Sequence, residues 1–183
     1  MMLSSRTWTR SERRSRNEGD STMTDDVWGS LVAAERGVAE LRLSFSRSAS
    51  MSTVLAASLE VGASVWEQRA ALSFLRSFPS EILNHVPRLF QLTLGERWEG
   101  EARELLARSA GSRVIAAVVR CVMEGIPLPA AEDYLHVAAL LARLEERDTL
   151  KLVAADAARS DSPEIREAGE FICERYGHLI NCL

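Results

Sequence analysis

The sequence predicts an all-α fold, and three observations lead to this prediction. Apolar residues recur every three to four positions through most of the chain, which is the spacing of one face of an α-helix. The strict apolar–polar alternation of a β-strand is almost absent after Ser52. Gly, Pro, Ser and Asp residues separate the helical segments at short intervals. The expected helices cover residues 25–45, 52–61, 65–77, 81–93, 97–109, 113–124, 130–146, 149–159 and 163–176.

The N-terminal region divides into an extension and a helix. Residues 1–22 are rich in Ser and Arg and lack helical periodicity, so we expect them to be disordered. Thr24 is suited to cap an N-terminal helix within residues 23–46, which ends where the segment SRSAS begins. Met23 and Met51 each precede a predicted helix, so either is an alternative translation start.

Several helix starts are marked by side chains suited to that position. Ser64 and Glu67 have the spacing of a capping box, in which each side chain accepts a hydrogen bond from the backbone of the other. Asp148 is expected to be an N-cap, and Pro129 lies near the start of its helix. The loops between helices are short, so successive helices are expected to be antiparallel neighbours.

The last predicted helix has the clearest boundaries. Ser162 is suited to accept a hydrogen bond from the first turn, Pro163 fits the first helical position, and Gly177 is expected to end the helix. Apolar and small residues follow on one face, with glutamates opposite. A single helix of this length does not hold together in water, so its apolar face requires a neighbour.

The second helix of each successive pair repeats one pattern, a large apolar residue followed three or four positions later by alanine. The openings are Trp66, Trp98, Tyr134 and Ile165, and the alanines are Ala70, Ala102, Ala138 and Ala168. The openings are 32, 36 and 31 residues apart. This period favours a short right-handed α-solenoid of about four helix pairs over residues 52–177, followed by a C-terminal tail at 178–183. A compact helical bundle is the alternative, because it also has amphipathic helices and short loops.

The segment DSPEIREAGEFICERYG, residues 161–177, resembles the second helix of HEAT repeats, where an Asp-x-x-Pro-x-Val-Arg-x-Ala-Ala pattern is characteristic. The matching positions are Asp161, Pro163, Ile165, Arg166 and Ala168. The earlier units share the period but not the motif, and Trp66 and Trp98 stand where an aliphatic residue is usual. The resemblance to HEAT and armadillo-like proteins implies a helical-repeat fold and, by analogy with that fold, a role in binding other proteins.

Composition and charge narrow the function classes. No apolar run approaches the roughly 20 residues of a membrane-spanning helix, so we expect a soluble protein with no membrane partner. Three cysteines at ordinary spacings make a disulfide framework improbable and favour a reducing compartment, the cytoplasm. Residues 51–183 carry 14 basic against 19 acidic side chains, and residues 131–174 carry 5 against 11. This acidity argues against a nucleic-acid partner, because phosphate binding requires a basic patch.

No motif for catalysis or cofactor binding is recognisable. His85, His136 and His178 lie in no metalloprotease or triad spacing, and no Gly-rich phosphate loop occurs. Cys173, His178 and Cys182 form a C-x4-H-x3-C pattern, which lacks the fourth ligand of a tetrahedral zinc site. We therefore expect no metal and no cofactor, while enzymatic activity stays undecided.

The outward face of the second helices is the candidate partner-binding surface. It comprises Arg69, Arg76, Arg103, Glu104, His136, Arg143, Glu167, Glu170 and Glu174. We expect Trp66 and Trp98 to pack in the core, and the charge along the surface to run from basic to acidic. Phe171 lies off the main apolar stripe, so its exposure would mark a docking site.

The function expected from these features is non-enzymatic binding of an unidentified protein partner, as an adaptor, scaffold or inhibitor. The alternatives are an enzyme that resembles the HEAT-like DNA glycosylases and a structural subunit that forms a homodimer or a larger homo-oligomer.

Overall fold

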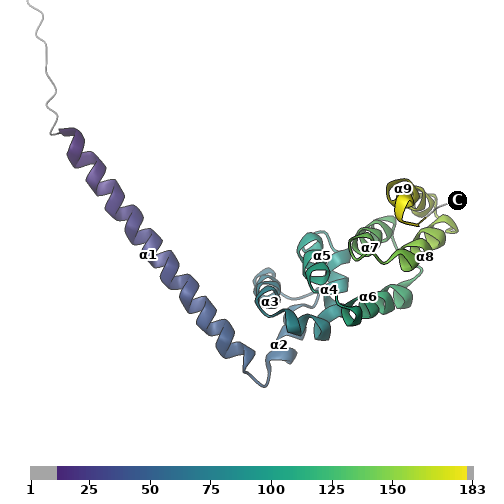
Figure 1. The fold of residues 1–183 in the computed structure, drawn as a ribbon, viewed down its shortest axis with the longest axis horizontal. Helices are drawn as coiled ribbons and strands as arrows, with labels where there is room; N and C mark the ends of the chain where they lie inside the picture. The colour runs from purple at the N-terminus through teal and green to yellow at the C-terminus, as the bar shows by residue number, and fades with distance from the viewer. Residues whose placement is uncertain (1–11, 181–183) are drawn as a thin grey trace, which may run out of the picture. The chain divides into compact units, whose positions relative to one another are not determined.

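The computed structural model describes residues 12–180, and over this range the protein contains α-helices, one 3₁₀ helix and no β-strand (Figure 1). The predicted all-α class is therefore confirmed. By its internal contacts the chain divides into two compact units, residues 1–51 and residues 52–183, which are described separately. None of the described helices combines the length and the apolar character needed to cross a membrane.

The first unit is built around one long helix, α1, which spans Glu12–Ser46. Its C-terminal end agrees with the prediction, but its start does not, because residues 12–22 were expected to be disordered and are helical. Extending an existing helix by one residue is far easier than nucleating a new one, and the 12–22 segment contains no proline to stop the extension. Residues 1–11, also expected to be disordered, lie outside the described part of the chain.

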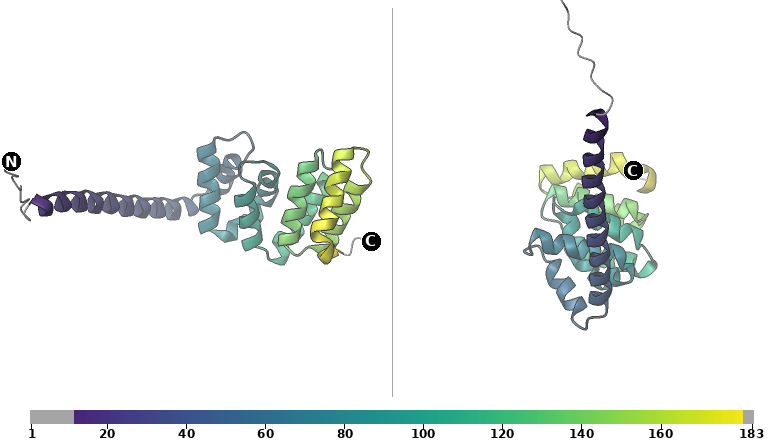
Figure 2. Two further views of the ribbon diagram at one scale, coloured as in Figure 1. Left: turned by 90° about the horizontal axis from the view of Figure 1, so that it is seen from above. Right: turned by 90° about the vertical axis from the view of Figure 1, so that its left-hand side faces the viewer.

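The second unit, which we call the helical unit, consists of short helices joined by short loops. Its elements are α2 (Met51–Ser58), α3 (Val65–Ser77), the 3₁₀ helix η1 (Pro79–His85), α4 (Val86–Leu94), α5 (Glu99–Arg108), α6 (Ser112–Gly125), α7 (Ala131–Arg143), α8 (Arg147–Ala158) and α9 (Pro163–Ile180). Among the second helices, α3 packs on α5, α5 on α7 and α7 on α9. In Figure 1 these four helices follow one another along one side, with α4, α6 and α8 on the other, and Figure 2 shows them side by side.

The core follows the apolar stripes of these helices. The buried aliphatic side chains of the second helices include Leu72, Leu75, Leu105, Leu106, Val137, Leu140, Leu141 and Ile172. Three of the predicted alanines, Ala102, Ala138 and Ala168, are also buried, so small side chains lie at the helix contacts as expected. Each stripe is shielded from water by the neighbouring helices, which supplies the main stabilisation of a helix too short to persist alone.

Helix α3, which was predicted to turn Trp66 and Ala70 toward the core, presents a different face to it. Trp66 is 76% exposed and Ala70 is also exposed, while Gln68 and Ala71 face inward. The Gln68 amide donates a 2.8 Å hydrogen bond to the Glu60 carbonyl oxygen and accepts a 2.6 Å bond from the Trp98 indole. These two bonds satisfy the buried amide and explain why a polar residue occupies the inner face.

Two other helices differ from the prediction for local reasons. The expected helix 81–93 is split into η1 and α4, because Pro87 lacks the N–H that a continuous α-helix would need. Helix α6 has apolar side chains on nearly every side, but only Val114, Val118 and Val122 are buried on it. Their spacing of four residues describes a single stripe, and the other apolar side chains of α6 are partly accessible.

The predicted helix boundaries are correct where a side-chain cap is formed. The Ser64–Glu67 capping box is present, with the Glu67 N–H donating to Ser64 Oγ at 3.2 Å and the Ser64 N–H donating to Glu67 Oε2 at 3.0 Å. The Ile165 N–H likewise donates to Ser162 Oγ at 3.3 Å. Two predictions were wrong. Asp148 lies in the first turn of α8 rather than at its N-cap, and α9 continues through Gly177, so residues 178–180 are helical rather than part of a tail.

Helices α8 and α9 approach each other closely at Gly169. A β-carbon at this position would lie 3.0 Å from the Ala158 backbone nitrogen and 3.1 Å from the Ala157 β-carbon. The first neighbour is backbone and has little freedom to move. Gly169 therefore sets the distance between the two helices, whereas a β-carbon at Gly177 would meet nothing within 4 Å.

A buried tyrosine ties the loop after α6 to α8. The Tyr134 hydroxyl donates to Asp156 Oδ2 at 2.5 Å and accepts from the Leu128 N–H at 3.2 Å. Burial and the bond to Asp156 raise the pKa of Tyr134 to about 12. The hydroxyl thus links α7, on which it lies, to the preceding loop and to α8.

The close approach at Gly169 predicts an unusual response to alanine. Gly169→Ala should lower the free energy of unfolding by about 1–3 kcal/mol, because the added carbon overlaps the α8 backbone. The control Gly177→Ala lies in the same helix and should raise it by up to about 1 kcal/mol through helix propensity alone. Urea unfolding followed by circular dichroism measures both, and equal stabilisation by the two substitutions would contradict the close approach.

The Tyr134 hydroxyl predicts a loss of stability in alkali. Unfolded tyrosine loses its proton near pH 10 and folded Tyr134 near pH 12, so folding should weaken between these values by up to about 2–3 kcal/mol. Tyr134→Phe should remove this pH dependence and cost about 1–2 kcal/mol at neutral pH, because Asp156 and the Leu128 N–H lose their partner. Unfolding titrations across this range test both effects.

Candidate functional site

The nine predicted surface residues lie on the four helices that were expected to carry them. Arg69 and Arg76 belong to α3, Arg103 and Glu104 to α5, His136 and Arg143 to α7, and Glu167, Glu170 and Glu174 to α9. The structure separates them into three groups. Five are engaged in ion pairs, Arg69 lies over the Trp66 ring, and the three glutamates of α9 form no ion pair among the described residues.

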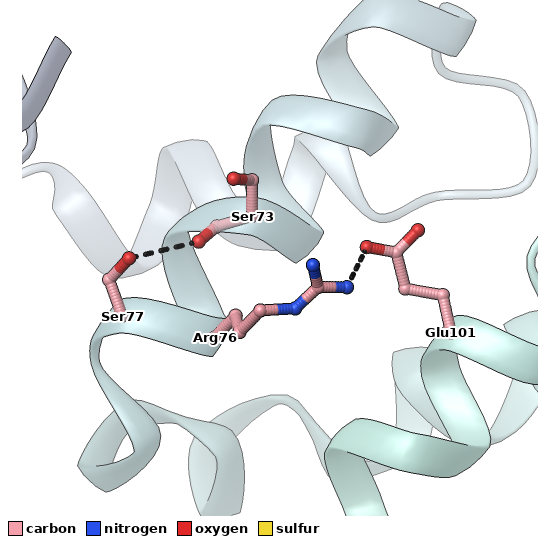
Figure 3. Close-up of polar contacts among 4 residues, drawn as sticks. All are labelled: Ser73, Arg76, Ser77 and Glu101. Atoms are coloured by element: carbon pink, nitrogen blue, oxygen red, sulfur yellow. Dashed lines mark hydrogen bonds and ion pairs between the residues drawn. The ribbon is translucent and has the colours of Figure 1, made fainter. Parts of the chain in front are cut away.

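Ion pairs connect α3 to α5 and α5 to α7. Arg76 on α3 donates a 2.5 Å bond to Glu101 on α5, as Figure 3 shows beside the Ser77–Ser73 contact within α3. Arg143 on α7 pairs with Glu104 on α5. Arg76 and Arg143 are therefore each paired with a carboxylate of α5.

Glu99 is the centre of a second cluster at the α5–α7 contact. It pairs with Arg103 one turn along α5, and its other oxygen lies 3.5 Å from His136 Nε2 on α7. Burial lowers the pKa of Arg103, and the nearby Tyr176 partly opposes this effect. The i, i+4 spacing of Glu99 and Arg103 was a usable signal in the sequence, but neither Glu99 nor Glu101 was predicted to take part in this surface.

The three described histidines occupy unlike environments. His85 is buried at the junction of η1 and α4, where desolvation lowers its pKa and neither ring nitrogen has a hydrogen-bond partner among the described residues. His136 faces Glu99, and His178 is exposed in the last turn of α9. The lowered pKa of His85 favours its neutral form. Among the described residues, no three His, Cys, Asp or Glu side chains form a group suited to a metal ion.

The cysteines differ from the expectation drawn from their spacing. Cys173 on α9 is disulfide-bonded, whereas Cys121 on α6 is free. Cys182, part of the C-x4-H-x3-C pattern, lies outside the described residues.

The exposed face of α9 combines three carboxylates with an aromatic ring. Glu167, Glu170 and Glu174 are exposed, and Phe171 between them is 46% exposed. The Arg175 guanidinium lies 6.0 Å from the centre of the Phe171 ring, at the outer limit of a cation–π contact. We call these five residues the α9 face. A large apolar ring at a solvated helix surface is the arrangement that the sequence reasoning linked to a docking site.

At the other end of the row, α3 presents a second exposed aromatic residue. The Arg69 guanidinium lies 6.0 Å from the centre of the Trp66 ring. Nearby, a cleft of about 510 Å³ is lined by residues that include Val61, Gln68 and Trp98. The Gln68 and Trp98 polar groups in this cleft are already bonded to one another, so the cleft offers a ligand few free partners.

Comparison of the chain with protein-family models, with curated proteins and with solved structures finds no match.

The contact between α5 and α7 predicts a charge-swap rescue. Arg143→Glu should destabilise the protein by up to about 1 kcal/mol, since it places two carboxylates together at a partly exposed site. Combining it with Glu104→Arg should restore most of this loss by recreating the pair in reverse. A double-mutant cycle measured by urea unfolding gives the coupling energy, and a value of zero would show that the pair does not hold the two helices together.

Proposed function

We propose that this chain is a non-enzymatic protein-interaction module, built as a right-handed α-solenoid of HEAT-like helix pairs, that binds a partner mainly through the α9 face. Three features support the architecture: the order of contacts along α3, α5, α7 and α9, the buried alanines at these contacts, and the Arg166 side chain. Its guanidinium donates to the carbonyl oxygens of Ser160 and Asp161 at 2.9 and 3.0 Å. It thereby fixes the turn that precedes the HEAT-like helix.

The observation that carries the proposal is the exposed Phe171 on an acidic surface. An exposed aromatic ring gains free energy when a partner shields it from water, and aromatic residues are enriched among those that dominate binding. The carboxylates of Glu167, Glu170 and Glu174 form no ion pair among the described residues. A matching partner is a protein segment with an apolar residue flanked by Lys or Arg.

The other predicted surface residues have a different role in this proposal. Arg76, Arg103, Glu104, His136 and Arg143 hold the second helices at fixed positions through their ion pairs. The same pairing weakens the case for a glycosylase-like enzyme, since arginines bound to glutamates are poor ligands for phosphates. The α9 face therefore stands as the principal contact surface.

The proposal predicts that Phe171 and the glutamates are both required for binding. Affinity purification of the tagged chain from its native host, followed by mass spectrometry, identifies the partners. Phe171→Ser should reduce their recovery at least tenfold, an effect typical of an interface hot spot. Reversal of all three glutamates to Lys should do the same, and capture by the wild-type chain should weaken as salt is added.

The matched control is Leu152→Ser on α8, because Leu152 is 49% exposed and Phe171 46%. This substitution removes a similar apolar side chain from another helix and should leave recovery unchanged. Equal helicity of all variants by circular dichroism excludes unfolding as the cause. If Phe171→Ser and the triple reversal capture the same partners as the wild-type chain, the α9 face is not the binding surface.

A further inference from the structure

Helix α1 carries an apolar stripe with the spacing of a coiled-coil seam. The stripe consists of Val27, Leu31, Ala34, Val38, Leu41 and Phe45, separated alternately by four and three residues. This alternation is the a/d pattern of the heptad repeat, with Leu31, Val38 and Phe45 at a, and Val27, Ala34 and Leu41 at d. We call it the heptad stripe. It extends over about 28 Å at the rise of an α-helix.

The heptad stripe is largely open to solvent. Val27, Leu31, Ala34, Val38 and Leu41 are all exposed, and Phe45 is half-buried. Exposure of a row of large apolar side chains costs free energy, and a helix gains most of its stability from covering such a face. The stripe therefore has the character of an interface.

We propose that the heptad stripe pairs with the heptad stripe of a second copy of this chain, which makes the protein a dimer joined through α1. A 4-3 stripe winds around another stripe of the same period, and an identical helix provides matching knobs and holes.

The charges of α1 agree with self-pairing. Within residues 26–46 the charged side chains are Asp26, Glu35, Arg36, Glu40 and Arg42, and none of them lies at an a or d position. Three acids and two bases leave this segment close to neutral, so two copies meet without strong repulsion. A nucleic acid or a strongly charged peptide has no comparable complement here. The dimer does not depend on the α9 face, and the two proposals are tested separately.

Two leucines on different sides of α1 give the test its matched control. Leu41 lies in the heptad stripe and is 71% exposed, whereas Leu43 lies outside it and is 51% exposed. Leu41→Glu and Leu43→Glu make the same chemical change, with the same effect on helix propensity. Leu41→Glu should raise the dimer dissociation constant at least tenfold, and Leu43→Glu should change it little. Ala34→Leu fills a small d position and should tighten the dimer.

Sedimentation equilibrium of the full-length chain over a range of micromolar concentrations measures these constants directly. The wild-type chain should approach twice its 20.2 kDa monomer mass. Circular dichroism of each variant separates a lost interface from a lost helix, and the gain expected for Ala34→Leu cannot arise from unfolding. A wild-type chain that stays monomeric, or equal weakening by Leu41→Glu and Leu43→Glu, would overturn the proposal.

Discussion

The helical unit depends on close contact between helices that are each too short to persist alone. Every one of them has an apolar stripe, and the stripes lose their contact with water only if neighbouring backbones approach closely. The approach is close at Gly169, where a β-carbon would press against Ala157 and Ala158. Buried alanines on α5, α7 and α9 place further small side chains in the packed interior.

Much of this architecture could be predicted from the sequence, because helical periodicity and caps are local properties. The capping box at Ser64 and the start of α9 at Ser162 are examples. The exposure of Trp66 could not be predicted, since it depends on Gln68 finding partners on two other elements, the Glu60 carbonyl and the Trp98 indole. Tertiary hydrogen bonds of this kind change which face of a helix is buried, and the apolar pattern of that helix alone does not reveal them.

The pairing of charged side chains on the candidate surface could likewise not be predicted from the sequence. The positions of the charged residues on the second helices followed from helical periodicity, but their pairing did not. Arg76 and Arg143 are neutralised by Glu101 and Glu104, which only the packing of adjacent helices brings within reach. What distinguishes the α9 face is therefore the absence of such pairing around Phe171 among the described residues, rather than its acidity alone.

The ion pairs of α5 also constrain the order in which the helix pairs can follow one another along the chain. Helices α3 and α7 both contribute arginines, and α5 between them supplies the carboxylates to both. If the pair containing α5 were deleted or moved, Arg76 and Arg143 would both lose their carboxylate partners. The units of this chain are thus not interchangeable, and their linear order is specified by electrostatics as well as by chain connectivity. Recombination within the gene that shuffled them would be penalised in the folded protein.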